Sequence, residues 1–214
     1  MLYFYFLWVE LASLAVALIQ YPALRKAGLA LFIPFLLLTN IVEWGSRYGV
    51  FTVHDSNNWV LNIFTLVEFI FYSFLFCHFS HSDRHRSRIK TLTVIIVSVC
   101  IANILFGQGL NRFHSYSFLV GSMLMVYFSG YYFFELMKRQ DYIRIVLLPS
   151  LWIVTGILFF YIGMFCYYIF YETYAYRYFA DYYMLFNILG NIFNIALYGC
   201  FIVSFLCMRR TTTL

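Results

Sequence analysis

The sequence predicts an all-α polytopic membrane protein with seven transmembrane helices, its N-terminus outside and its C-terminus in the cytoplasm. Three observations predict this fold class. The 214 residues are 64% hydrophobic and 11% charged, whereas an average soluble domain is about half apolar and about a quarter charged. Short polar connections separate apolar segments, most of them long enough for a hydrocarbon core of ~30 Å. Lys and Arg gather in alternate connections, as they do in multi-pass proteins.

The seven apolar segments are expected to form one transmembrane domain over residues 1–214, because the length suits a single domain. They cover roughly residues 2–20, 29–45, 58–79, 91–107, 117–137, 146–171 and 184–207. The first segment lacks the basic N-terminal region and the small-residue cleavage site of a signal peptide, so we read it as a retained helix. The connections are too short for a soluble kinase, nucleotide-binding or DNA-binding module.

The orientation follows from counting Lys and Arg on the two sides. One side carries eleven: Arg25, Lys26, Arg84, Arg86, Arg88, Lys90, Lys138, Arg139, Arg144, Arg209 and Arg210. The other side carries three: Arg47, Arg112 and Arg177. The first side is therefore expected to be cytoplasmic. The net charge of +5 then reflects the excess of Lys and Arg in the cytoplasmic connections, and no nucleic-acid partner is expected.

The segment 58–79 contains the most informative pattern in the chain. Its polar residues Asn58, Asn62, Thr65, Glu68 and Tyr72 follow one another at steps of four, three, three and four. On a helix, such residues share one face. Glu68 falls near the middle of the segment, where a charged group costs ~2.5–3.5 kcal/mol on insertion scales. We therefore expect Glu68 to face protein or a wet cavity.

The last segment repeats this pattern with Tyr183, Asn187, Asn191, Asn194 and Tyr198. Three amides within the bilayer need hydrogen-bond partners. They could bond to neighbouring helices, or they could line a polar pocket jointly with the third helix. The second reading predicts a substrate- or ion-binding set, which also includes Glu10 in the first segment. The set is Glu68, Asn62, Thr65, Glu10, Asn187, Asn191 and Asn194.

Other polar residues have simpler interpretations. His78, His81, Asp83 and His85 have imperfect metal-ligand spacing within a strongly basic stretch, so we expect a solvated basic loop near anionic lipid and no metal site. Glu43 and Arg47, four residues apart, are expected to form a local ion pair. The five cysteines lie in or beside apolar segments and contain no CxxC motif, which is typical of buried thiols. No catalytic residue set and no cofactor site is expected.

Three stretches carry a resemblance to a known group. These are Asn62-Ile63-Phe64-Thr65 through Glu68-Phe69, Pro149 through Tyr161, and Asn187 through Asn194. They resemble small, uncharacterised seven-helix proteins of Bacteroidota-type bacteria, which implies a location in the bacterial inner membrane and supplies no mechanism. Leu61-Asn62-Ile63-Phe64 also matches Phe186-Asn187-Ile188-Leu189 at a shift of 125 residues. This layout is similar to the 3+1+3 repeat of SWEET-type carriers, whose sites lie between the halves.

Three functions remain open on the sequence. A carrier for a small polar solute or a monovalent cation or proton would use the two polar stripes and Glu68. A sensor, or a subunit of a larger membrane complex, would act through a protein partner at its cytoplasmic face, because the chain has almost no soluble mass. A lipid-modifying enzyme would use Glu68 or Glu10 as general acid or base, although no nucleophile accompanies either. The lipid bilayer is a partner in all three.

Overall fold

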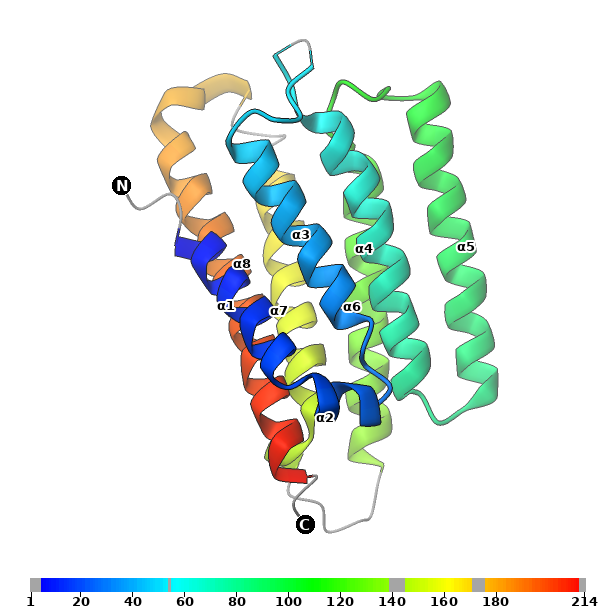
Figure 1. Ribbon diagram of the computed structural model, residues 1–214. Helices are drawn as coiled ribbons and strands as arrows, with labels where there is room; N and C mark the ends of the chain where they lie inside the picture. The colour runs from blue at the N-terminus through cyan, green and yellow to red at the C-terminus, as the bar shows by residue number, and fades with distance from the viewer. Residues whose placement is uncertain (1–4, 54, 139–144, 171–175, 212–214) are drawn as a thin grey trace. The chain divides into compact units, whose positions relative to one another are not determined.

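The computed structural model describes residues 5–53, 55–138, 145–170 and 176–211, with the backbone alone for 176–186 and 209–211 (Figure 1). The described residues are helical apart from turns and one isolated bridge between Val53 and Ser56. The helices are α1 (Tyr5–Ile19), α2 (Tyr21–Lys26), α3 (Phe32–Arg47), α4 (Asn58–Phe79), α5 (Asp83–Phe106), α6 (Ser115–Met137), the 3₁₀ turn η2 (Ile145–Leu147), α7 (Pro149–Phe170) and α8 (Tyr176–Thr211). The prediction of an all-α protein is confirmed over this part of the chain.

In the described part of the chain, five helices, α4 to α8, are long and apolar enough to cross a membrane. Helices α1 and α3 have 15 and 16 residues. At ~1.5 Å per residue they are shorter than the ~30 Å hydrocarbon core. The seven-span count and the orientation of the termini therefore stay predictions. Helix α4 has the bounds that hydropathy predicts, because a polar residue or turn lies at each of its ends.

The basic stretch before the fourth apolar segment is helical, so its assignment as a loop is wrong. Helix α5 begins at Asp83, eight residues before the predicted start. Ser82 caps it, since its hydroxyl accepts the backbone N–H of His85 at 3.4 Å. Asp83 in the first turn favours the helix dipole and pairs with Arg86 at 3.3 Å. Arg and Lys have high helix propensity, so polarity here does not interrupt the helix.

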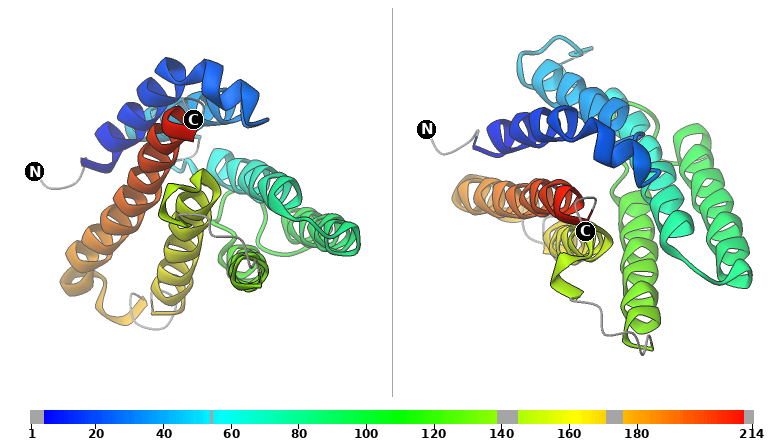
Figure 2. Two further views of the ribbon diagram at one scale, coloured as in Figure 1. Left: turned by 90° about the horizontal axis from the view of Figure 1, so that it is seen from below. Right: turned by 60° about the horizontal axis from the view of Figure 1, so that its bottom comes forward.

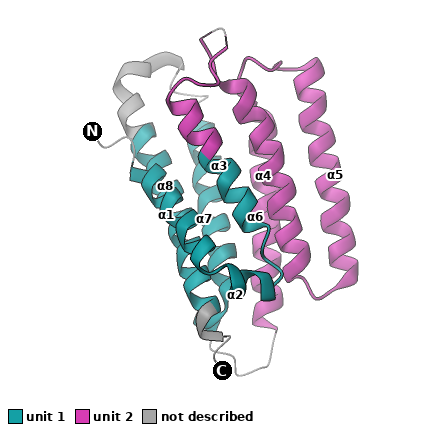
Figure 3. Cartoon of the chain, viewed as in Figure 1, with its two compact units in different colours: residues 1–40, 140–214 teal, residues 41–139 magenta. Residues whose placement is uncertain are grey.

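The contacts divide the chain into two compact units (Figure 3). Unit 1 contains residues 1–40 and 140–214, and unit 2 contains residues 41–139. We describe each unit by itself. The single domain and the internal repeat stay predictions.

In unit 1, α8 packs against both α7 and α1, and Figure 2 shows these helices running alongside one another. Small residues allow the close approach of α7. A side chain at Gly163 would collide with the ring of Phe193 on α8. Phe32 packs edge-on against Phe201 and Phe205, with 5.2 Å between ring centroids in both pairs. Such aromatic contacts and small-residue positions are typical of helix packing in membranes.

In unit 2, α4 packs against α5 and α6, which also contact each other. Gly121 on α6 lies under the ring of Phe69, and a Cβ at this position would collide with that ring. Phe76 and Phe128 continue the α4–α6 contact with 5.6 Å between ring centroids. Gly121 therefore allows the close approach of α4 and α6. This packing fixes which face of α4 is buried and so positions its polar side chains.

Candidate functional site

Asn62, near the start of α4, holds the connection between α5 and α6. Its side-chain N–H groups donate to the carbonyls of Arg112 at 2.8 Å and Leu110 at 3.2 Å. Its carbonyl oxygen accepts the backbone N–H of His114 at 3.0 Å. Asn62 is 3% exposed, and its bond to the His114 N–H is buried, whereas the other two bonds are partly buried. The amide is thus engaged by the connection 107–114, and its role as a substrate ligand stays a prediction.

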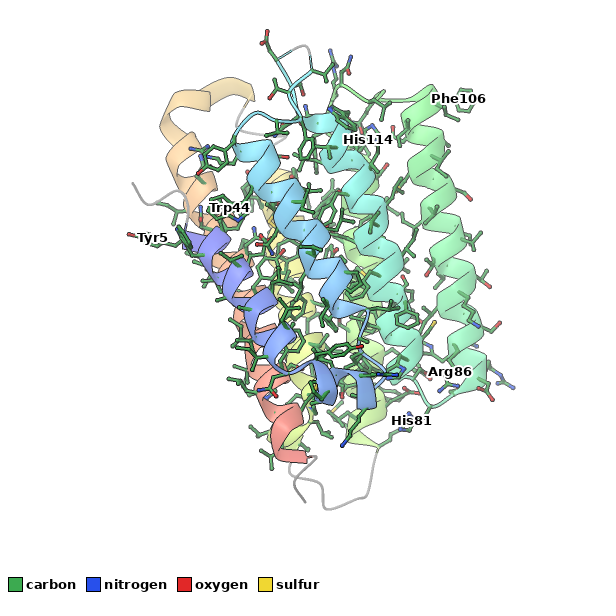
Figure 4. The ribbon with its side chains drawn as sticks, viewed as in Figure 1. Tyr5, Trp44, His81, Arg86, Phe106 and His114 are labelled. Atoms are coloured by element: carbon green, nitrogen blue, oxygen red, sulfur yellow. The ribbon has the colours of Figure 1, made fainter. Side chains whose placement is uncertain are left out.

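The same connection is fixed at further points. The side chain of Asn58 donates to the carbonyl of Asn111 at 3.1 Å. Asn103 near the end of α5 donates to Gln108 at 2.9 Å and to the hydroxyl of Ser117 at 2.8 Å. In Figure 4, His114 lies at this end of unit 2, and Arg86 lies at the opposite end. The first half of the α4 stripe therefore organises a loop.

The second half of the stripe is different. The Thr65 hydroxyl donates to the carbonyl of Leu61 at 2.9 Å, within its own helix. Glu68 lies about 9 Å further along the axis from Asn62, at ~1.5 Å per residue. Its side chain is 8% exposed. Tyr72, one turn further on, lies beside the Glu68 carboxyl group. The expectation that Glu68 faces protein is thus met by its burial.

A second carboxyl group, Glu43 on α3, lies close enough to Glu68 for their charges to interact. Both residues belong to unit 2. Arg47, four residues after Glu43, has an interaction of its own, and the local ion pair predicted for these two residues stays a prediction. The sequence shows that each of the two glutamates lies in an apolar segment. It does not indicate that the two side chains lie near each other.

The polar stripe of α8 bonds mainly within its own helix. Asn191 donates to the carbonyl of Asn187 at 2.8 Å, and Asn194 donates to the carbonyl of Gly190 at 2.9 Å. The side-chain oxygen of Asn191 is buried and has no hydrogen-bond partner among the described residues. Asn187 has an interaction of its own. Asn191 and Asn194 thus donate within their own helix, and Asn191 keeps an acceptor available.

Glu10, the remaining predicted residue, is fully buried on α1 in unit 1. Ser13, three residues further on, is also fully buried, and its hydroxyl has no partner among the described residues. Glu10 has interactions within the chain. It lies in an apolar helix of 15 residues.

The predicted site residues fall into two groups. Asn62, Thr65 and Glu68 share α4 in unit 2, whereas Glu10, Asn187, Asn191 and Asn194 belong to unit 1. The pocket expected to be lined by both stripes stays a prediction. Within the described part of the chain, no three His, Cys, Asp or Glu side chains gather as a metal site would require.

Chemically, the Glu43–Glu68 pair can hold a proton or a small cation, because two carboxylates in an apolar helical environment are costly when both are ionised and uncompensated. Comparison with known proteins adds no family to this chemistry. No family model, no curated protein and no solved structure matches the chain.

Proposed function

We propose that this helical membrane protein is a carrier in which the Glu43–Glu68 pair binds a proton or a monovalent cation and couples it to the passage of a small polar solute. One observation carries the proposal: Glu68 is buried in a long apolar helix beside a second carboxyl group.

An ionised carboxylate is costly in a medium of low polarity. Two neighbouring carboxylates repel each other strongly where water is excluded. A proton on one of them, or a bound cation, removes that repulsion. Because either ion can leave when the site meets water, the pair is suited to reversible binding. Ionisable residues at membrane depth are typical of ion pathways and proton relays.

Other predicted residues have secondary roles in this proposal. The free acceptor of Asn191 supports hydrogen bonding to a solute, and Asn187, Asn194, Thr65 and Glu10 remain candidate ligands. Asn62 is proposed to position the connection 107–114, on the strength of its three hydrogen bonds. The excess of Lys and Arg on one side supports an outside N-terminus, and the resemblance to bacterial seven-helix proteins supports an inner-membrane location.

The test is transport by the purified protein in liposomes. Under an imposed pH or Na⁺ gradient, wild-type protein should give ion flux, and Glu68→Gln should reduce it to the background of empty liposomes. Glu43→Gln should also reduce it. The matched control is Asp83→Asn, since Asp83 is a carboxylate whose side chain is 95% exposed. Flux in Glu68→Gln equal to wild type would reject the proposal.

A sensor, or a subunit of a larger complex, is the second candidate. The exposed first turns of α5, with Arg84, Arg86 and Arg88 in helical form, favour it, because a rigid basic helix end can bind an acidic partner. Crosslinking in native membranes separates the two functions. A defined partner joined at these turns, together with absent flux in liposomes, would support the second candidate.

A further inference from the structure

An open groove between α4 and α5 lies outside the set of residues discussed so far. Its volume is about 300 Å³, at the lower end of the ~300–1,000 Å³ typical of small-molecule sites. Its walls include Ile70, Ser73, Phe74 and Cys77 from α4, and Lys90 and Val94 from α5. All these residues belong to unit 2. The groove is therefore a feature of one unit.

The groove is mostly apolar, and its apolar walls are exposed. The exposed fractions are 50% for Ile70, 41% for Phe74 and 65% for Val94. Both helices are long enough to cross a bilayer, so such side chains meet hydrocarbon rather than water. An acyl chain can fill an apolar groove of this volume, whereas a water-soluble ligand would gain little binding free energy from apolar walls.

The hydroxyls beside the groove are turned away from a ligand. Ser73 is 3% exposed, so its hydroxyl is buried behind the apolar surface of the groove. The hydroxyl of Thr93 on α5 donates to the carbonyl of Ile89 at 2.7 Å. The body of the groove therefore suits a hydrocarbon chain rather than a polar group.

Lys90 supplies a positive charge to the same groove. Its ammonium group acts electrostatically on Cys77, which lines the opposite wall. It forms no ion pair with a described residue. Arg84, Arg86 and Arg88 precede it on α5, and the acid among them, Asp83, is paired with Arg86. Figure 4 shows Arg86 at this end of unit 2. This end of the groove favours an anion.

We propose that the groove binds one anionic glycerophospholipid from the surrounding bilayer, with an acyl chain along Ile70, Phe74 and Val94 and the phosphate at Lys90. The charge complementarity at Lys90 selects an anionic headgroup. A second transmembrane helix suits the groove less well, because close helix contacts favour small residues and the groove is lined by the bulky side chains of Phe74 and Ile70. The site is independent of Glu68.

The test is native mass spectrometry of the full chain released from micelles that contain either phosphatidylglycerol or phosphatidylcholine with identical acyl chains. Wild-type protein should retain one phosphatidylglycerol at ratios where phosphatidylcholine is lost. Lys90→Gln should lower that retention about fivefold, the effect of one basic residue near anionic lipid. Val94→Trp, which fills the groove, should lower retention of both lipids. Because Val94 is exposed, this variant should fold.

Arg84→Gln is the matched control, since Arg84 is exposed on the same helix and does not line the groove. It should change retention by less than about twofold. Equal losses in Arg84→Gln and Lys90→Gln would overturn the proposal in favour of a diffuse basic surface. Displacement of the lipid by millimolar inorganic phosphate would overturn it in favour of a site for free anions. Loss of a protein dimer, rather than of lipid, in Val94→Trp would assign the groove to a second copy of the chain.

Discussion

The polar stripes of α4 and α8 look alike in the sequence and differ in the structure. On α4, Asn62 bonds across to another segment and fixes the connection 107–114. On α8, Asn191 and Asn194 donate to carbonyls of their own helix, four residues back. Both patterns satisfy the spacing rule for one helix face. The spacing of polar residues therefore shows which face of a helix they share. Whether they fix another segment depends on their hydrogen-bond partners.

A second contrast lies within α4 itself. Asn62 has three hydrogen bonds to backbone groups, whereas Glu68 has a second carboxyl group and a tyrosine as its neighbours. The three hydrogen bonds of Asn62 stabilise one conformation of the connection. In the proposed function, the charge of the Glu68 site changes when a proton or a cation binds or leaves. We therefore assign structural stability to the start of the stripe and proposed ion binding to its middle.

The largest effect on stability is expected for Asn62→Leu. It removes the hydrogen bonds to the carbonyls of Leu110 and Arg112 and leaves the buried N–H of His114 without a partner, and an unsatisfied buried group costs ~1–3 kcal/mol. We expect the free energy of unfolding in mixed micelles to fall by about 3 kcal/mol. An unfolding curve that coincides with that of wild type would show that the connection is held by other contacts.

Glu68→Gln should separate function from stability. The amide keeps the size of the side chain and removes an ionisable group from an apolar helix, so the free energy of unfolding should rise, by ~1 kcal/mol. Ion flux in liposomes should be lost in the same variant. If unfolding free energy instead fell by as much as in Asn62→Leu, Glu68 would belong to the structural half of the stripe.

The smallest effect is expected on α8. Asn194→Leu removes a hydrogen bond to a carbonyl of the same helix, and that carbonyl keeps its backbone partner. Side-chain hydrogen bonds of membrane helices contribute ~0.6 kcal/mol on average. Chemical denaturation should therefore place this variant within that range of wild type. A loss as large as that of Asn62→Leu would remove the distinction between the two stripes.

The sequence predicts helices well where hydrophobicity alone decides, as for α4. It fails at α5, because a basic stretch reads as a loop although Ser82 caps it and its residues favour helix. It also misses α2, a helix of six residues that hydropathy averages do not detect. The burial of Glu68 can be predicted from its position in an apolar segment. The proximity of Glu43 to Glu68 and the hydrogen bonds of Asn62 to the connection 107–114 cannot, because both depend on segments distant in the sequence.

The central claim is that the Glu43–Glu68 pair exchanges a proton or a cation. Infrared difference spectroscopy of the protein in lipid, from about pH 5 to about pH 9, tests it most directly, with Glu68→Gln as the reference. The account predicts a carboxyl band that Glu68→Gln lacks and that titrates in this range or shifts when Na⁺ or K⁺ is added. A Glu68 band that is unchanged by pH and by both cations would contradict the account and would make Glu68 a structural residue like Asn62.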